Sequence, residues 1–506
     1  MFWLAITPIG VILVLMVGLR WGASRAGAAG YLSALVIAIA FFGARLELLA
    51  YTHAKALLLI IDVLLIIWTA FFLFRVADEA GAIRVIGQSL PHLTADRGMQ
   101  ALVIGWVFGS FLQGVGGFGV PMAVIAPLLV GLGFSPLSAV VIPSVGHSWA
   151  ITFGSLGSSF NALMAATGYS WEELAAPAAL FLGVAGLGVG FVVAHAAGGW
   201  AAVRRLSGTV LILGGAMGTG QYLAATSGLW NIGGFIGGLT GLVVGFPLAR
   251  WHRGDTEDNG SLDWHALLTA ISGYAALVVL TLCIQLIPII HDTLDKYRFT
   301  LNFPRLVTTL GHTTPAGPGR EIPLFRHASM ILLVSALIAY LIYHRAGWYK
   351  DGAFLRIVSG TLKRVITSSV GITAMVSMAV LMQHVGMTDA LAQGLSTAMG
   401  RAFPALSPWM GALGAFMTGS NTNSNVVFAA LQMRTAELLG FPVAIILAAQ
   451  TSGAALGSVI APTKIVVGAS TGGMAGREGE IMRKMLLYIG ILILLISFLA
   501  TIGVML

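Results

Sequence analysis

The chain alternates between long apolar runs and short polar loops. Roughly 17–25 consecutive apolar residues are enough for a helix to cross a bilayer, and the runs of this kind predict about twelve transmembrane helices. They lie at 3–19, 29–46, 56–75, 137–166, 176–198, 208–226, 229–249, 265–289, 328–343, 364–384, 443–470 and 484–505. The pattern therefore predicts an all-α polytopic membrane protein.

Two further segments, 98–134 and 407–440, are apolar at both ends and glycine-rich or polar in the middle. Each is too short for two complete crossings and a turn, given the rise of about 1.5 Å per helical residue. Non-helical backbone at membrane depth persists only where it is buried in protein or lines a cavity. Each segment therefore predicts a re-entrant hairpin, in which a polar tip joins two half-helices.

Composition strengthens the membrane assignment. Of the 506 residues, 57% are hydrophobic and 9% are charged, whereas soluble domains carry roughly 25% charged residues. The net charge of +8 indicates cytoplasmic loops rather than nucleic-acid binding, because Lys and Arg accumulate in such loops. The single cysteine, Cys283, excludes an intrachain disulfide and a cysteine-based metal site. Because Arg20 and Arg25 follow the first run, that run predicts a spanning helix rather than a signal peptide.

The distribution of Lys and Arg sets the orientation of the predicted crossings. With the N-terminus outside, the inner loops hold 17 of the 27 basic residues and the outer loops hold 8. This bias predicts that both the N-terminus and the C-terminus lie outside. Seven crossings separate the two hairpins, so the hairpins enter from opposite faces and form an inverted repeat.

The two hairpins also share an ordered spacing. Three residues of the first hairpin match three of the second, and a Leu-Gly-Phe triplet follows each: Gly109, Phe111, Gly114 and 132–134 correspond to Gly414, Phe416, Gly419 and 439–441. We therefore expect one transmembrane domain, 1–506, in three parts. These are a first half at 1–206, connecting helices with an outer loop at 207–326, and a second half at 327–506.

Interrupted helices expose backbone N–H groups that bind anions. Half-helices are predicted to begin near Pro121, Ser148, Asn425 and Pro462, with their N-termini aimed at the midplane. Matched interruptions in two halves of a membrane protein also mark the substrate site of transporters. The sequence therefore predicts a substrate or ion site formed by Gln113, Gly114, Gly116, Gly117, His147, Ser148, Ser420, Asn421, Thr422, Asn423, Ser424, Asn425, Thr451, Ser452 and Lys464.

Ionisable residues inside the membrane are few, and each has two interpretations. His147 either carries a proton or contacts a carboxylate, or it is a packed neutral histidine. Lys464 either attracts an anion or extends toward the cytoplasmic face. Asp62, near the outer end of its helix, is predicted to be interfacial. The G-x-G-x-x-G at 114–119 lacks the flanking strand of a dinucleotide site, and no catalytic set accompanies it, so the chain is not expected to be an enzyme.

Several of these motifs together resemble the lactate permease family of bacteria and archaea. They are the segments 111–121, 129–134, 418–425, 428–432 and 460–462. The resemblance runs in order over most of the chain. It implies proton-coupled transport of lactate, and often glycolate, across the cytoplasmic membrane of a prokaryote. It also implies two re-entrant hairpins, inverted repeats, a homodimer and elevator-type motion, as in related divalent-anion/sodium symporters.

The chain departs from that family at the two tips. The resemblance implies a glutamate at the position of Gln113 and an aspartate at the position of Asn421, and both are amides here. A carboxylate beside a carboxylate substrate must be protonated or paired with a cation, so this chain lacks one device for proton coupling. His147 and Lys464 are basic additions at the breaks.

Two functions follow as expectations. The first is ion-coupled transport of a lactate-like monocarboxylate around a midplane anion site, with His147 as the remaining proton carrier. The alternative is transport of a different organic or inorganic anion, coupled to sodium or working by exchange. The expected partners are a small carboxylate anion and the lipid bilayer, without nucleic acid. No cofactor is expected beyond H⁺ or Na⁺ as the coupling ion.

Overall fold

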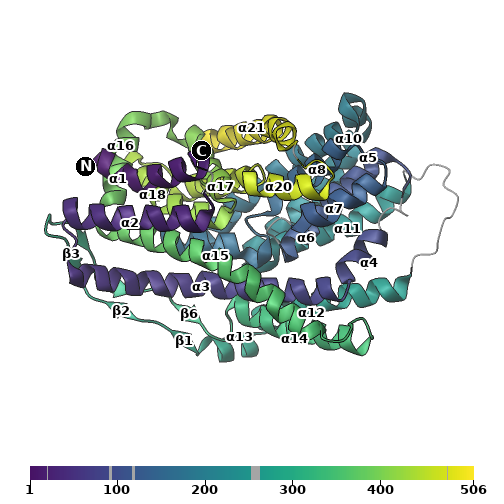
Figure 1. Cartoon of the computed structure of the whole chain (residues 1–506), viewed down its shortest axis with the longest axis horizontal. Helices are drawn as coiled ribbons and strands as arrows, with labels where there is room; N and C mark the ends of the chain where they lie inside the picture. Colours follow the sequence, from purple (N-terminus) through teal and green to yellow (C-terminus); the bar gives the residue numbers. More distant parts are fainter. Residues whose placement is uncertain (20, 90–93, 117–119, 252–262, 476, 506) are drawn as a thin grey trace.

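The computed structural model describes residues 1–506 except 20, 90–93, 117–119, 252–262, 476 and 506. The described chain is almost entirely helical, which confirms the all-α prediction. Many of the long helices lie side by side along the longest axis of the molecule (Figure 1). Their outward faces carry large exposed apolar side chains such as Val243, Leu355 and Leu487. Exposure of these apolar side chains is favourable in lipid and unfavourable in water.

The first part of the chain builds the N-terminal helices and the first interrupted pair. Its elements are α1 Phe2–Leu13, η1 Val14–Gly18, α2 Ala23–Phe41, α3 Leu46–Glu79, α4 Ala82–Ser89, α5 Arg97–Gln100, η3 Ala101–Phe108, α6 Gly109–Val115, α7 Val120–Gly131, α8 Pro136–Gly146, η4 Ser148–Ala150, η5 Ser155–Gly157 and α9 Ser158–Thr167. Proline and serine begin α8: Pro136 is its first residue, and the Ser135 hydroxyl accepts from the backbone N–H of Ser138.

The middle of the chain holds the longest helices and the outer loop. Its elements are α10 Trp171–Ala224, η6 Ala225–Leu229, η7 Trp230–Ile232, α11 Gly233–Trp251, α12 Trp264–Leu286, α13 Pro288–Asp295, β1 Arg298–Phe299, β2 Asn302–Phe303, β3 Leu306–Val307, β4 Thr313–Thr314, β5 Gly317–Pro318 and β6 Ile322–Pro323. The strands pair as β1–β6, β2–β5 and β3–β4, all antiparallel. This nesting makes 298–323 one long, irregular hairpin, which we call the outer loop.

The last part contains the second interrupted pair. Its elements are α14 Ala328–Arg345, α15 Ala353–His384, α16 Met387–Met399, η8 Gly400–Ala402, α17 Phe403–Thr418, α18 Asn421–Leu439, α19 Val443–Ser458, α20 Pro462–Thr471 and α21 Glu478–Gly503. Pro462 is the first residue of α20, as the sequence predicts for a new half-helix.

Nine helices of the described chain are long and apolar enough to span a membrane, and a tenth span results if α8 and α9 are counted as one bent pair. The predicted count of twelve is not confirmed. One reason is the run Trp171–Trp251, which counts as one 81-residue helical stretch where the sequence predicts three crossings. Its backbone leaves helical geometry at Gly198 and Gly199, and again at Ser227 and Gly228, between the predicted crossings.

Both predicted hairpins are helix–break–helix pairs in the structure. Residues 97–115 and α7 form the first pair, and α17 and α18 form the second. Gly117, a predicted tip residue, lies outside the described residues. That each pair turns back within the bilayer stays a prediction.

The bases of the two pairs lie at opposite ends of the molecule, near α5 and α16 (Figure 1). Beside the first base, Arg205 binds Asp96. Beside the second, Arg434 Nε lies 2.7 Å from Asp389 Oδ1. Asp389 also lies 3.6 Å from His312 Nδ1, on the outer loop. The two pairs therefore enter the molecule from opposite ends. That these ends face opposite sides of a bilayer stays a prediction from the parity of crossings.

Glycine lets each pair pack closely against the helix that follows it. A Cβ at Gly146 of α8 would overlap the carbonyl oxygen of Gly105 in η3. A Cβ at Gly453 of α19 would overlap the carbonyl oxygen of Pro408 in α17. Gly146 and Gly453 are separated by the same interval as the matching triplets 132–134 and 439–441. The two halves thus repeat a backbone-to-backbone contact as well as a sequence motif.

Candidate functional site

The first half is interrupted more deeply than the sequence predicts. We expected a half-helix from Ser148, but Ser148 begins only the short turn η4, and α9 begins at Ser158. Ser155, Leu156 and Gly157 all have positive φ, at 48°, 56° and 73°. Non-glycine residues in this conformation cost of order 1–3 kcal/mol each and cluster at functional sites. The break between α8 and α9 therefore spans residues 147–157.

The second half is interrupted less than the sequence predicts. Only Gly419 and Ser420 are non-helical between α17 and α18, and Asn421 to Asn425 form the first turn of α18 rather than its preceding tip. Gly419 has a φ of 70°, which glycine adopts without strain. The Ser420 hydroxyl caps α18 by accepting from the Asn423 N–H at 3.2 Å. Capping explains the early start, because Ser is among the preferred N-cap residues.

The two interruptions meet in a buried polar contact, which we call the polar centre. Asn421 Nδ2 donates to Thr152 Oγ1 at 3.0 Å. Thr152 Oγ1 in turn lies 3.2 Å from Thr451 Oγ1 of α19. Asn425 Nδ2 donates to Thr451 Oγ1 at 3.0 Å and to the Ser159 carbonyl at 2.9 Å. The polar centre therefore joins residues that lie almost 300 positions apart.

Several acceptors in and around the polar centre have spare capacity. The side-chain oxygens of Asn421, Asn423, Asn425 and Ser452 are buried without a hydrogen-bond partner among the described residues, and so is His147 Nε2. Native proteins leave few buried polar groups unpaired, and each of these atoms can accept a hydrogen bond from a bound molecule. His147 Nδ1 donates to the Pro143 carbonyl at 2.6 Å, which leaves Nε2 as the free nitrogen of the ring.

Three helix N-termini converge beside these acceptors. Ser159, in the first turn of α9, lies 3.0 Å from Thr422 in the first turn of α18, measured between their hydroxyl oxygens. A Cβ at Gly419 would lie 2.9 Å from Thr463 Oγ1, in the first turn of α20. Helix N-termini carry partial positive charge and free N–H groups. The arrangement of α9, α18 and α20 therefore favours an anion.

Lys464 adds a full positive charge near this convergence. It is half-buried in the first turn of α20, and its Nζ donates to Ser458 Oγ at 3.1 Å. No carboxylate pairs with it among the described residues. Of its two predicted roles, attraction of an anion fits this position.

The other predicted site residues have identified structural contacts. Gln113 is buried at the end of α6, and its backbone and side chain border Gly154 in the first break. Gly114 lies against the backbone of Phe235, and Gly116 against the ring of Phe74. The Ser148 and Ser424 hydroxyls donate to carbonyls of Val145 and Gly411. No hydrogen bond joins these residues to the polar centre within the described structure.

Two members of the polar centre, Thr152 and Ser159, are not among the site residues predicted from the sequence. Both lie in the Gly/Ser-rich stretch 152–159, inside the half-helix that the sequence predicts from Ser148 onward. The glycine and hydroxyl residues that predict a break at 414–425 are therefore also present at 152–159. Gln450, which donates to the Ser424 carbonyl at 3.3 Å, had no such signal.

Asp62 is buried rather than interfacial, with 1% of its surface exposed. It accepts from Asn161 Nδ2 at 2.8 Å, from Arg320 Nε at 3.0 Å and from His327 Nε2 at 2.8 Å. Arg320 Nη2 also donates to Asn161 Oδ1 at 2.9 Å. This network fastens the outer loop to α3 and α9. Two partners come from distant sequence, which is why the apolar pattern alone misplaced Asp62.

The chain is similar in sequence to known permeases over most of its length. The model of the L-lactate permease family matches residues 1–506. The chain is 27% identical over 447 residues to the L-lactate permease of Escherichia coli strain K12, which covers 83% of this chain and 80% of that relative. It is 27% identical over 519 residues to the glycolate permease GlcA of the same strain, with 95% and 91% covered. The solved YdaH transporter of Alcanivorax borkumensis aligns with a TM-score of 0.47 and 17% identity, over 86% of this chain and 84% of that one.

Proposed function

Because the chain belongs to the L-lactate permease family, we propose that it is a secondary transporter of a small monocarboxylate such as lactate or glycolate. The observation that carries the proposal is the polar centre, where unpaired buried oxygens lie beside three converging helix N-termini. The N-termini of α9, α18 and α20, with Lys464, suit the carboxylate. Alternating access around this site would move the anion across the cytoplasmic membrane.

The unpaired acceptors suggest which carboxylates bind. A 2-hydroxy acid carries a hydroxyl donor next to its carboxylate, and Asn421 and Asn425 each offer a buried oxygen without a donor. A site that pairs with a substrate hydroxyl rejects analogues that lack it, because its own polar groups are then left unpaired. We therefore propose that L-lactate and glycolate are preferred over propionate.

Counterflow of labelled L-lactate in proteoliposomes tests both statements. Unlabelled L-lactate and glycolate should compete with the label, whereas propionate should compete at least tenfold less well, which corresponds to about 1.4 kcal/mol of discrimination. If neither L-lactate nor glycolate competes for uptake, the monocarboxylate function is wrong. If propionate competes equally well, recognition of the hydroxyl is wrong and the carboxylate function stands.

A second candidate function is supported by the same oxygens. Asn421, Asn423, Asn425 and Ser452 are neutral oxygen ligands, which suit a hard cation such as sodium. Gln113 and Asn421 also lack the carboxylates that the family resemblance implies for proton coupling. This favours a sodium-coupled transporter of another anion, or an exchanger. Gradient-driven net uptake into proteoliposomes, with sodium replaced by choline, separates the alternatives, because only the sodium-coupled form should lose net uptake.

A further inference from the structure

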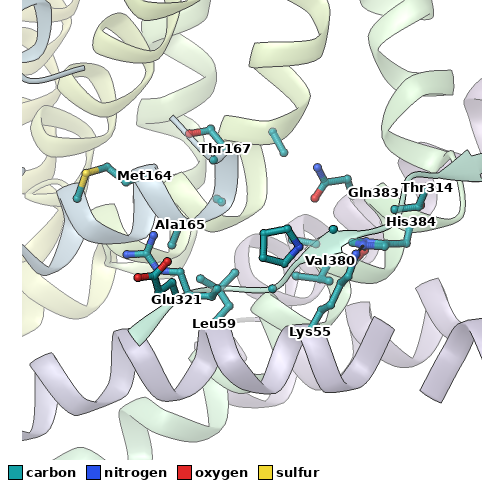
Figure 2. Close-up of a pocket in the computed structure, with 18 of the residues that line it drawn as sticks. Lys55, Leu59, Met164, Ala165, Thr167, Thr314, Glu321, Val380, Gln383 and His384 are labelled. Carbon is teal, nitrogen blue, oxygen red and sulfur yellow. Dashed lines mark hydrogen bonds between the residues drawn. The ribbon is translucent and has the colours of Figure 1, made fainter. Parts of the chain in front are cut away.

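A second cavity lies between the outer loop and the polar centre. Its volume is about 570 Å³. Figure 2 shows Lys55, Gln383 and His384 around one side of it and Met164 and Ala165 at the other. Residues of α3, α9, α15, α18 and the outer loop form its walls. It is therefore a site distinct from the polar centre, and it is large enough for a small organic anion.

The charges around this cavity do not balance. Four lining residues are charged or titratable: Lys55, Arg320, Glu321 and His384. Arg320 is paired with Asp62, and Glu321 is paired with Arg298 of β1. His384 Nδ1 donates to the Val380 carbonyl at 2.8 Å, so its other nitrogen is free to accept. Lys55 is thus the charge that the cavity leaves unneutralised.

The surroundings of Lys55 hold its ammonium group in place without cancelling its charge. Lys55 Nζ lies 3.2 Å from His384 Nε2 and 5.3 Å from the centre of the Phe303 ring. A neutral imidazole and an aromatic face orient an ammonium and leave it positive. Among the described residues no carboxylate lies within ion-pair distance of Lys55. The half-buried ammonium therefore creates an unscreened positive potential in the cavity.

The cavity also lies next to the polar centre. Val426 and Ala430 of α18 line it, and Val426 follows Asn425 directly in sequence. Thr422, which bonds Ser159 in the polar centre, lies four residues before Val426, about 6 Å along the helix axis. On the α9 side, Met164 lines the cavity five residues beyond Ser159 of the polar centre, about 7.5 Å along the helix axis. An anion in the cavity would be separated from the polar centre by a thin apolar layer.

We propose that this cavity is a capture site for small carboxylate anions, with Lys55 as its charged group and Gln383 as its neutral hydrogen-bonding group. Gln383 is exposed at the cavity wall, whereas the Thr167 hydroxyl there donates to the Leu163 carbonyl. The role of this site in transport rests on the proposed function. Its ability to bind a carboxylate depends only on the charge of Lys55. The site raises the local concentration of anions before they reach the polar centre.

Thiol labelling measures the potential in the cavity without requiring transport. In a Cys283→Ser background, Gln383→Cys places the single thiol at the cavity wall. We expect a sulfonate-bearing methanethiosulfonate to react faster than its trimethylammonium counterpart. Lys55→Gln should lower that rate ratio by about tenfold, the scale of one charge pair near a protein surface. Lys55→Arg should keep the ratio.

Lys296→Gln is the matched control, because Lys296 is exposed next to the outer loop but does not line the cavity. It should leave the ratio unchanged, and L-lactate should slow labelling of Gln383→Cys when Lys55 is present. An unchanged ratio in Lys55→Gln, or the absence of protection by L-lactate, would overturn the capture site. The ratio of labelling rates and the protection by L-lactate can both be measured on a protein that shows no lactate counterflow. Failure of the capture site is therefore distinct from failure of the proposed function.

Transport kinetics give the second reading. Lys55→Gln should raise the KM for L-lactate by about tenfold at low ionic strength and leave kcat unchanged, because capture precedes the transport step. Added salt should reduce the difference between the variant and the wild type, since screening weakens exposed charges. A loss of kcat at constant KM would place Lys55 in the transport step and contradict a role in capture.

Discussion

The carboxylate of Asp62 supports three partners at once and is almost completely buried. Asp62→Ala leaves Arg320 and His327 without their acceptor. Removing one member of a buried ion pair costs about 3–5 kcal/mol, because the remaining charge stays desolvated. We expect a loss of this size in the free energy of unfolding, measured by denaturant titration of the detergent-solubilised protein.

Asp292→Ala is the control for that measurement. The Asp292 side chain is 74% exposed and contacts only His291 in the described structure. Exposed sites of this kind change stability by about 0.5 kcal/mol or less. Equal losses in the two variants would contradict a structural role for the Asp62 network.

His147 gives a prediction about pH. Its ring is fully buried, its Nδ1 is held by Pro143 and its Nε2 has no partner in the described structure. Histidine is the side chain that gains and loses a proton between about pH 5 and 8. If His147 carries the coupled proton, His147→Gln should flatten the pH dependence of L-lactate uptake in proteoliposomes. An unchanged profile would exclude His147 as the proton carrier.

A functional residue could be predicted from the sequence only where its neighbours along the chain share its role. Asn421, Thr422 and Asn425 belong to six consecutive polar residues inside an apolar segment, so composition was sufficient to select them. Arg320 and His327 lie 258 and 265 positions from Asp62. Only the tertiary fold joins them. A hydrophobicity pattern reports whether a residue is near lipid or water, and it carries no information about a partner so far along the chain.

Helices α17 and α19 pack so closely that their contact depends on glycine. A Cβ at Gly453 would overlap the Pro408 carbonyl, which is backbone and cannot rotate away. Gly453→Ala must therefore push the two helices apart. Overpacking of this kind costs about 1–3 kcal/mol, and α19 also carries Thr451 of the polar centre. We expect lower thermal stability together with at least a tenfold loss of L-lactate counterflow.

Gly490→Ala provides the matched comparison on α21. Nothing lies within 4 Å of a Cβ at Gly490. Alanine is favoured over glycine in a helix by roughly 0.5–1 kcal/mol, so this variant should be neutral or slightly stabilised. Similar behaviour of the two variants would show that the α17–α19 contact tolerates expansion.

The sequence predicts that the helices are interrupted in both halves, but it does not predict at which residues each interruption begins and ends. Glycine and polar residues within apolar segments indicated both pairs, and Pro462 indicated the start of α20. The second break is shorter than expected because Ser420 caps α18 early. The first is longer because Ser155 and Leu156 adopt left-handed conformations that the fold imposes. Such conformations reflect tertiary constraints rather than local preference.

The arrangement of the two interrupted pairs brings the halves of the chain together at one point. Their bases lie at opposite ends of the molecule (Figure 1), yet Asn421 and Asn425 of the second pair donate to Thr152 and to the Ser159 carbonyl of the first half of the chain. Both termini lie toward the end that also holds β3 (Figure 1). That both termini lie on the same side of a bilayer stays a prediction from the loop charges. Which side faces outward, and whether two copies form a homodimer, stay predictions from the sequence.

Labelling from outside the cell tests the orientation and the inverted arrangement together. In a Cys283→Ser background, Gly131→Cys marks the base of the first pair, where a Cβ meets nothing within 4 Å. Arg401→Cys marks the exposed base of the second. Because the basic residues favour inner loops, a membrane-impermeant maleimide should label Arg401→Cys in intact cells and reach Gly131→Cys only after permeabilisation.

The other outcomes of that labelling separate two statements. Labelling of Gly131→Cys alone in intact cells would reverse the predicted orientation and keep the inverted arrangement, because the bases would still lie on opposite faces. Labelling of both thiols in intact cells would place both bases on one face. The inverted repeat would then be wrong, and with it the symmetry on which alternating access around a central site depends.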